Sequence, residues 1–501
     1  MKKRIYHGLC AVLLGLALTG CASGTQNTQL NSASSNNTET SSNEVAVSMS
    51  ELPNIPPSKL FQHVLPQKFT LKNGIPVWYV HNAILPMVTV KFVFPGGSCE
   101  DPANKEGRAA LMASLLKEGA NGKSATELSD AIEEIGASIS TFASTDYISV
   151  SLQVLTQFFE TGLDLTMDII RKPNLESADL ERLKKIWLNS LNMRAASPEQ
   201  LAKLASLIDF FGEGHPYARP TEGYIGTVNA ISLDDIRENY QNVVVPGKVM
   251  ISAVGNIEPA QFIEMLNQRL GDAPAQPAYV QPAPIVHETR QQTFTIIDKP
   301  GAPQSIIRIM LPAPALNDPL SQDLKFVNIP FGDSFTSRLM QNIREDKGYS
   351  YGANSAVASL PRDGYILASS AVATNVTGAA LSEFMKEFKR LETGDFTQEE
   401  LERARATWQS EIIQNFENQA GVASLFLNLL VSGRPDDFQN AFLKRTRDMD
   451  LDTFNSISRQ FSPFSTASIT IVGDKSEILK QTKDLGLVAP TFRDKEGKII
   501  P

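Results

Sequence analysis

Histidines, which could bind a zinc ion, are few in this chain of 501 residues, and they are far apart. Two histidine imidazoles can coordinate one zinc ion when they lie four positions apart on a helix, because residues i and i+4 share a face. No two of the five histidines have this spacing. They are His7, His63, His81, His215 and His287. We therefore do not expect zinc-dependent hydrolysis by this chain alone, and we predict no metal site in it.

The cysteines point to acylation rather than to a disulfide or a metal site. Residues 1–20 combine a basic start, a short apolar run "LCAVLLGLAL" and the small residues "LTG" before Cys21. This pattern resembles a bacterial lipoprotein signal peptide, in which cleavage leaves the thiol of the cysteine to carry lipid. Cys10 would leave with the signal and Cys99 would remain alone, which excludes an internal disulfide. The alternative is an ordinary secretory signal in which Cys21 falls by chance.

The residues after Cys21 bear on location and partners. Ala22 stands where an Asp usually retains such lipoproteins at the inner membrane, so the resemblance implies the outer membrane, facing the periplasm, in a Gram-negative organism. Residues 21–58 are rich in Ser, Asn and Thr and predict a disordered tether between lipid and folded body. The formal net charge of −9 gives no indication of nucleic-acid binding.

From about Leu60 the sequence alternates between strand and helix patterns. "FTLKNGIPVWYVHN" predicts a hairpin with an Asn-Gly turn, and "MVTVKFVFPGG" alternates as a half-buried strand does. "SATELSDAIEEIGASIS" predicts a helix that begins at a capping Ser124 and ends at Gly136. Its apolar face would carry Leu128, Ile132 and Ile135. Residues 177–211 predict one long amphipathic helix.

The chain also repeats itself. Residues 232–256 align with residues 450–474 without a gap, and Gly255 then falls on Gly473. In each copy a helix leads to a strand that ends in Val-Gly, which predicts a duplicated domain. The predicted boundaries are an N-terminal domain at 59–272, a Pro/Ala-rich linker at 273–290, a C-terminal domain at 291–490 and a tail at 491–501.

The N-terminal half resembles the pitrilysin/insulinase family of zinc metallopeptidases, the inverzincins. The segment "PGGSCEDPANKEGRAALMASLLKEGANGKSATELSDAIEEIGASISTFASTDY" follows that family's order of strand, Gly turn, metal helix, second helix and return strand. "HPYARPTEG" at 215–223 and "SAVGNI" at 252–257 fit its later landmarks. The likeness covers about 60–485 and implies an α+β fold of two homologous α/β sandwich domains, a duplicated half-clamshell. His215 matches a family position that is not a metal ligand.

The metal-binding positions of the family are not kept. Active members carry His-x-x-Glu-His on the metal helix and a further glutamate ligand on a later helix. On this chain those positions fall on Ala110, Ala113, Ser114 and Ser190. Alanine and serine preserve a small volume and tolerable helix propensity. The resemblance therefore implies a metallopeptidase fold that does not bind the metal ion.

The C-terminal half keeps a second family feature. "GDSFTSRLMQNIREDKGYSYGANS" predicts a helix capped by Ser334, with Arg344 in its last turns and Tyr351 early on the next strand. Phe335, Leu339 and Ile343 would lie on one stripe of this helix. The pair resembles the family's Arg…Tyr signature, which in active members holds the substrate backbone and stabilises the oxyanion. The alternative is an Arg344 paired with a helix-end carboxylate and a Tyr351 packed in a sheet.

Together these resemblances imply a catalytically incomplete, lipid-anchored subunit that completes the chamber of a zinc-bearing sister peptidase. The zinc would belong to the partner, the substrate would be a peptide, and the pair would form a metalloendopeptidase. Three alternatives stay open: a purely structural protein, a stand-alone peptide-binding lipoprotein that is a monomer or homodimer, and a zinc protease with unrecognised ligands.

Overall fold

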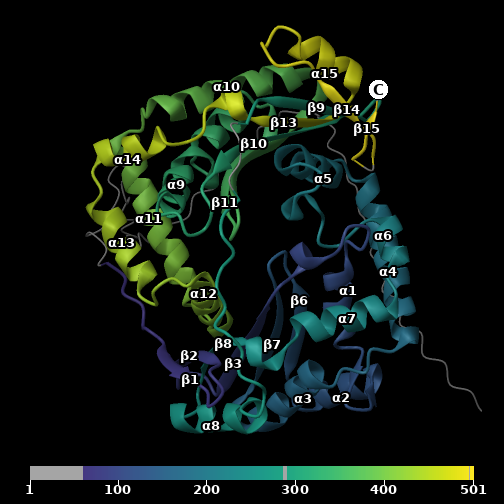
Figure 1. Ribbon diagram of the computed structural model, residues 1–501. Coiled ribbons are helices and arrows are strands. Elements are labelled where there is room, and N and C mark those ends of the chain that lie inside the picture. Colours follow the sequence, from purple (N-terminus) through teal and green to yellow (C-terminus); the bar gives the residue numbers. More distant parts are fainter. Residues whose placement is uncertain (1–59, 286–289, 496, 501) are drawn as a thin grey trace, which may run out of the picture. The chain divides into compact units, whose positions relative to one another are not determined.

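The structure is a computed structural model that describes residues 60–285, 290–495 and 497–500. Two large β-sheets and a small ribbon of β4 (Gly119–Ala120) and β5 (Lys123–Ser124) organise these residues (Figure 1). None of the helices in the described segments is both long and apolar enough to cross a membrane. The predictions for the signal segment, the tether and Cys21, and those for His7 and His287, lie outside the described residues.

The first sheet comes from the N-terminal half of the chain and has the order β1-β2-β8-β3-β7-β6. Its strands are β1 (Gln67–Thr70), β2 (Pro76–His81), β3 (Met87–Pro95), β6 (Ser138–Ala143), β7 (Tyr147–Leu155) and β8 (Met250–Gly255). Strands β2 and β8 are parallel, and all other neighbours are antiparallel. The predicted hairpin is confirmed, with Gly74 at φ 92° between β1 and β2.

The second sheet comes from the C-terminal half and has the order β11-β12-β10-β13-β9-β14-β15. Its strands are β9 (Thr293–Asp298), β10 (Gln304–Ala313), β11 (Ser350–Ser359), β12 (Gly364–Ala373), β13 (Ser468–Gly473), β14 (Thr491–Arg493) and β15 (Ile499–Ile500). From β9 to β11 it repeats the pairings of the first sheet from β2 to β6, including one parallel pair, β9 with β13. This confirms an α+β fold of two homologous domains. The last strands lie in the segment 491–501 that the sequence analysis set apart as a tail.

Helices accompany each sheet. Those of the N-terminal half are α1 (Arg108–Leu115), α2 (Ala125–Glu134), α3 (Phe159–Arg171), α4 (Ser177–Ala196), α5 (Pro198–Phe211), α6 (Ile225–Ala230), α7 (Leu233–Val243) and α8 (Pro259–Leu270). Those of the C-terminal half are α9 (Leu320–Asn328), α10 (Thr377–Thr393), α11 (Gln398–Asn415), α12 (Gln419–Ser432), α13 (Phe438–Asp448), α14 (Leu451–Ser458) and α15 (Lys475–Thr482).

Local sequence signals determine several of these boundaries. Helix α2 begins at Ser124, whose hydroxyl accepts from the backbone N–H of Glu127 while the Glu127 carboxylate accepts from the N–H of Ser124. This reciprocal capping satisfies two backbone donors at the start of the helix. Gly136 follows the helix at φ 59°, a conformation that glycine adopts without strain. Both predicted ends of this helix are therefore confirmed.

The sequence repeat corresponds to one structural unit in each half. Residues 232–256 form α7 and β8, and residues 450–474 form α14 and β13. Both strands are buried at every residue and lie inside their sheets rather than at an edge. Burial on both faces explains why most residues of these strands are apolar, which helps to make the repeat visible in the sequence.

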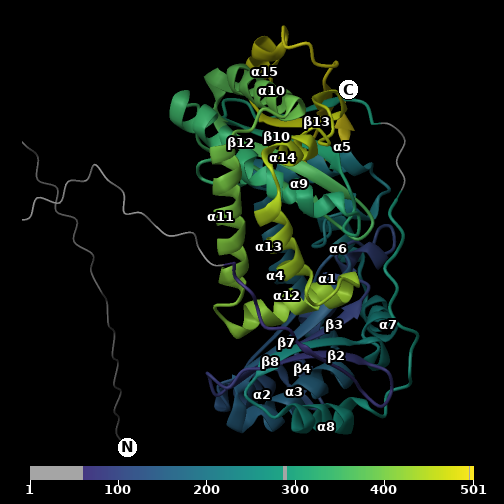
Figure 2. The same cartoon turned by 90° about the vertical axis from the view of Figure 1, so that its left-hand side faces the viewer.

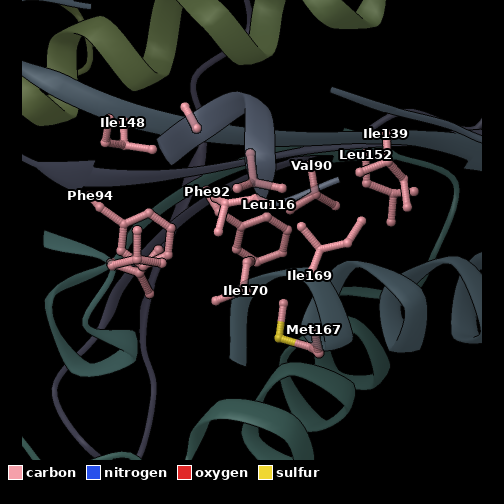
Figure 3. Close-up of a cluster of buried hydrophobic side chains, with 14 of the residues drawn as sticks. Val90, Phe92, Phe94, Leu116, Ile139, Ile148, Leu152, Met167, Ile169 and Ile170 are labelled. Carbon is pink, nitrogen blue, oxygen red and sulfur yellow. The ribbon is translucent and has the colours of Figure 1, made fainter. Parts of the chain in front are cut away.

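The N-terminal core lies between the first sheet and its helices. Val90, Phe92 and Phe94 alternate along β3, so their side chains point to the same face of the sheet. Figure 3 shows them beside Ile148 and Leu152 of β7 and beside the buried side chains of α3. The α3 residues shown are Met167, Ile169 and Ile170. This packing fixes β3, and with it the start of the chain segment that leads into α1.

Two helices are exchanged between the halves. Helix α5 follows α4 in the N-terminal half, yet it packs on β10 and β13 of the second sheet. Helix α12 follows α11 in the C-terminal half and packs on β3 and β8 of the first sheet (Figures 1 and 2). The α12 contacts join its Val422, Phe426 and Leu429 to Trp78, Val80 and Val254. Each sheet is thus covered partly by a helix of the other half, which ties the two halves together.

The exchange explains why the predicted single helix at 177–211 is wrong. The helix breaks at Ser197, which ends α4 and caps α5 by accepting from the N–H of Gln200 at 3.3 Å. Pro198 follows as the first residue of α5, where its missing N–H leaves no hydrogen bond unmade. The break lets α4 stay on the first half while α5 crosses to the second.

Candidate functional site

Helix α1, which corresponds to the metal helix of the resemblance, is held at its start by one carboxylate. Asp101 accepts from the N–H groups of Gly107 at 3.1 Å and Ala109 at 3.0 Å, and the Arg108 guanidinium lies 3.5 Å away. Burial raises the pKa of Asp101 to about 6. Gly107 has φ 98°, and a Cβ there would meet the carbonyl oxygen of Glu222 at 2.9 Å. These contacts keep α1 in place without any metal ligand.

The four positions that correspond to metal ligands carry no group that could bind an ion. Ala110 and Ala113 are buried in the N-terminal core. The Ser114 hydroxyl donates to the carbonyl of Ala110 at 3.0 Å, and the Ser190 hydroxyl donates to that of Ile186 at 3.3 Å. Helices α1 and α4 pack together, so the structure does bring these positions to one region. Within the described segments, no three His, Cys, Asp or Glu side chains group as metal ligands would.

The described histidines have local partners. The His63 ring stacks on Phe416 with centroids 4.8 Å apart, and burial lowers its pKa. The Nδ1 atom of His215 accepts from the N–H of Tyr217 at 3.1 Å, and the ring stacks on Phe211 at 4.8 Å. His81 ends β2 on the exposed side. The contacts of His63 and His215 are those of structural histidines.

Arg344 lies on a short π-helical turn, Met340–Asp346, that precedes β11. Its guanidinium carbon lies 4.9 Å from the centre of the Phe335 ring, and its Nε lies 3.4 Å from a carboxylate oxygen of Glu345. The pairing with Glu345 agrees with the alternative prediction for this arginine. About a third of the side chain, 37%, remains exposed, so the guanidinium is held but still accessible.

The prediction for the start of this helix was wrong in two respects. Phe335 does not join the buried stripe of Leu339 and Ile343 but is 63% exposed. The residues 334–337 form a turn, and helical conformation begins only at Arg338. Ser337 rather than Ser334 accepts from a helix N–H, that of Met340 at 3.4 Å. The later start rotates Phe335 out of the apolar face and over Arg344.

Tyr351 lies at the start of the edge strand β11, in a β-bulge. Tyr351 and Gly352 together lie opposite the single residue Ala371 of β12. The Ser350 hydroxyl donates to the Gly352 carbonyl at 2.6 Å and accepts from its N–H at 2.7 Å, and Ser370 donates to the same carbonyl at 2.8 Å. A bulge of this kind redirects a side chain relative to a regular strand.

The bulge leaves the Tyr351 ring 92% exposed, and its hydroxyl has no hydrogen-bond partner in the described part of the chain. Tyr349, two residues earlier, packs instead against the C-terminal core. The alternative prediction of a Tyr351 packed in the sheet is therefore wrong. The role of Ser350, the position of Phe335 over Arg344 and the bulge itself were not predicted, although a glycine inside a strand pattern is a recognised signal for a bulge.

Two family descriptions match this chain. "Insulinase (Peptidase family M16)" matches residues 77–222, and "Peptidase M16 inactive domain" matches residues 230–407, so that together they cover more than half of the chain. The second match begins at the end of α6, inside the N-terminal half, and runs into α11 of the C-terminal half.

Similar proteins come from several bacteria. A protein of Helicobacter pylori named "Non-peptidase homolog YmxG" is 25% identical over 420 residues, which are 80% of this chain and 93% of that protein. A Bacillus subtilis protein named "Uncharacterized zinc protease YmxG" is 20% identical over 395 residues, covering 79% and 95%. The crystal structure of a peptidase M16 inactive domain from Pseudomonas fluorescens has a TM-score of 0.75 at 22% identity, covering 82% of this chain and 98% of that chain.

Proposed function

Because the chain belongs to peptidase family M16, the insulinase family, we propose that it is a member without hydrolytic activity of its own. It contributes Arg344 and Tyr351 to the active site of a zinc-bearing partner that cleaves peptides. The observation that carries this proposal is the Tyr351 side chain, which the bulge directs outward and whose hydroxyl has no hydrogen-bond partner among the residues that the structure describes. A fold that needed Tyr351 only for packing would not hold it in this conformation.

The two residue types suit the proposed chemistry. A guanidinium and a phenol both donate hydrogen bonds, and negative charge develops on the carbonyl oxygen when a peptide bond is attacked. Phe335 and Glu345 hold the Arg344 guanidinium, and Ser350 and Gly352 form the bulge that holds Tyr351. Donors that are fixed before the reaction lower its barrier, and the loss of one typically costs about 10²–10³ in rate.

The residues of the N-terminal half support the proposal that zinc is bound by a second chain. The residues at the four ligand positions do not fit a metal ion, since two are methyl groups and two are hydroxyls bonded to backbone carbonyls. No step of the reaction is therefore assigned to this half. The zinc, and the base that acts with it, would come from the partner.

The names of the relatives point in two directions. The Helicobacter pylori relative is named a non-peptidase homologue, whereas the Bacillus subtilis relative is named an uncharacterized zinc protease. The substitutions at Ala110, Ala113, Ser114 and Ser190 favour the first for this chain, because zinc needs nitrogen, sulfur or carboxylate ligands.

The proposal includes attachment to the cell envelope through lipid on Cys21. Its support is the three-part signal pattern of residues 1–21 and the absence of an Asp after the cysteine. The pair would then act at the outer membrane, on peptides in the periplasm. Labelling cells with a radioactive fatty acid tests this step, and a Cys21→Ala variant that kept the label would contradict it.

The catalytic role is tested by co-expressing this chain with a neighbouring gene product that carries His-x-x-Glu-His and measuring peptide hydrolysis. This chain alone should be inactive, the partner alone should be weakly active, and the pair should be active. Arg344→Ala and Tyr351→Phe should lower kcat at least tenfold while the two chains still co-purify. Tyr349→Phe and Arg403→Ala are matched controls, because Tyr349 packs in the core and Arg403 pairs with Glu399 on the exposed side of α11.

A second candidate is a structural or peptide-binding protein with no role in hydrolysis. It is favoured by the contacts of Arg344 with Phe335 and Glu345, which would suit a purely internal role. It predicts unchanged hydrolysis in both the Arg344 and the Tyr351 variants. That result would exclude the catalytic role and leave this second function.

A further inference from the structure

A cavity of about 860 Å³ lies in the N-terminal half, away from Arg344 and Tyr351. Helices α4, α5 and α6 form its walls, together with the residues just before α1 and Lys495, Gly497 and Lys498 near the C-terminus. Its volume is within the range of about 300–1,000 Å³ that is common for small-molecule sites. A neighbouring cavity of about 210 Å³ shares four of its residues, Arg194, Gln200, Leu204 and Arg219.

A buried carboxylate in this cavity has no counter-charge. Glu106 is 9% exposed, and its Oε1 atom accepts only a long hydrogen bond of 3.4 Å from the N–H of Asn104. Its Oε2 atom has no hydrogen-bond partner, and no cation of the described chain lies within 4.0 Å of the carboxylate. An isolated buried charge is costly unless something pairs with it.

A guanidinium in the same cavity is also without a counter-charge. Arg219 donates to the backbone carbonyls of Asp101 at 2.7 Å and Cys99 at 3.3 Å, and it forms no ion pair within the described residues. Its Nε–H is buried and has no acceptor among the described residues. Glu106 and Arg219 therefore face one cavity with opposite charges, yet they do not pair with each other.

The charges of Glu106 and Arg219 both act on the phenol of Tyr224, so these residues lie near one another. Burial raises the pKa of its phenol, the Glu106 carboxylate raises it further, and the Arg194 and Arg219 guanidiniums act against this rise. Arg194 is itself engaged, since it donates to the carbonyl of Gly223. One end of the cavity thus brings the Glu106 carboxylate near two guanidiniums, those of Arg194 and Arg219.

Another part of the cavity wall is apolar. It is formed by Leu191 of α4, by three residues of α5 and by Ile225 at the start of α6. The α5 residues are Leu201, Leu204 and Ile208. A ligand of this site would carry a donor and an acceptor of opposite charge at one end and an apolar group at the other.

We propose that this cavity binds a small zwitterion with an apolar side chain, a free amino acid or a short peptide. Its ammonium group would donate to Glu106, its carboxylate would accept from Arg219, and its side chain would lie against Leu201, Leu204 and Ile208. The site is separate from the proposed shared active site and does not depend on a zinc-bearing partner. Its test therefore uses the full chain alone, and failure of either proposal leaves the other standing.

The test is calorimetric titration of the purified full chain with L-leucine and with leucyl-leucine. N-acetyl-leucine lacks the ammonium group and leucinamide lacks the carboxylate, so each should bind at least tenfold more weakly. Glu106→Gln keeps the size of the side chain and should raise the Kd for leucine at least tenfold. Leu204→Trp should abolish binding by filling the apolar end, with the charged end unchanged.

Glu213→Gln is the matched control. Glu213 also lines the cavity, but its carboxylate is exposed and lies 3.4 Å from Arg493. Its loss should change the Kd for leucine less than twofold, and circular dichroism should show that all variants are folded. Absence of heat with both leucine and leucyl-leucine would overturn the proposal. Equal affinities for leucine and N-acetyl-leucine, or for wild type and Glu106→Gln, would overturn it as well.

Discussion

The guanidinium of Arg344 lies over the ring of Phe335, with 4.9 Å between the guanidinium carbon and the ring centre. Nine positions separate the two residues, and the turn at 334–337 brings the ring back over the helix that follows. An exposed phenylalanine would otherwise be an unfavourable surface residue. Its place over Arg344 indicates a role in orienting the guanidinium.

Phe335 should therefore matter for activity in the proposed complex with a zinc-bearing partner. Phe335→Ala removes a cation–π contact worth about 0.5–1 kcal/mol at an exposed site and should lower kcat about two- to fivefold. Phe335→Trp keeps an aromatic face and should restore most of the rate. Steady-state kinetics on purified complexes checks this, and equal rates in wild type and Phe335→Ala would refute the orienting role.

Ser350 should support Tyr351 through the bulge. Ser350→Ala removes two hydrogen bonds to Gly352 and should cost about 1 kcal/mol of the free energy of unfolding. In the complex, kcat should fall while KM changes little, because Tyr351 is then less well placed. Ser369→Ala is the control, since its hydroxyl bonds Asn354 on the same hairpin without touching the bulge. A kcat that falls equally in both variants would argue against this role.

The Asp101 carboxyl at the start of α1 should make the free energy of unfolding depend on pH. Burial raises the pKa of Asp101 from 3.8 to about 6, so between these values the folded chain keeps a proton that the unfolded chain releases. The contribution of Asp101 to the free energy of unfolding is therefore fully present below pH 3.8, and it is lost as the pH rises through 6. The free energy of unfolding should fall by at most about 3 kcal/mol over this interval.

Urea unfolding of wild type and Asp101→Asn between pH 4 and 6 measures this slope. The amide does not titrate, so the variant should show a flatter dependence whatever its absolute stability. Parallel curves for the two proteins would show that Asp101 is not the group responsible.

The exchanged helix α5 should be held by a buried ion pair. Asp209 of α5 lies 2.7 Å from Arg493 of β14, and both side chains are almost fully buried. Removing one partner of such a pair leaves a buried charge, so Asp209→Ala should cost about 3–5 kcal/mol of unfolding free energy. Lys444→Ala breaks an exposed pair with Asp448 and should cost less than about 1 kcal/mol. Similar denaturant midpoints for the two variants would contradict the claim.

Features that depend on neighbouring residues could be predicted from the sequence. The cap at Ser124, the turn at Gly74 and the strand before Gly255 are encoded within a few positions, because hydrogen bonds and backbone conformation there are local. The repeat around Gly255 and Gly473 could also be seen, since it is a pattern of the sequence itself. The sequence also shows alanine at residues 110 and 113, which the family resemblance aligns with metal-ligand positions.

Features that depend on distant residues were decided by the tertiary structure. The break at Ser197 exists because α5 packs on the sheet of the other half. The sequences of α4 and α5 do not show which sheet each helix packs on. Tyr351 points outward because a bulge forms against β12, and a bulge is a property of two paired strands. Glu106 and Arg219 meet at one cavity although 113 positions separate them in the sequence. Local hydrogen bonds and backbone conformation determine where helices and strands begin and end. The free energy of tertiary packing determines which side chains remain exposed or face a cavity.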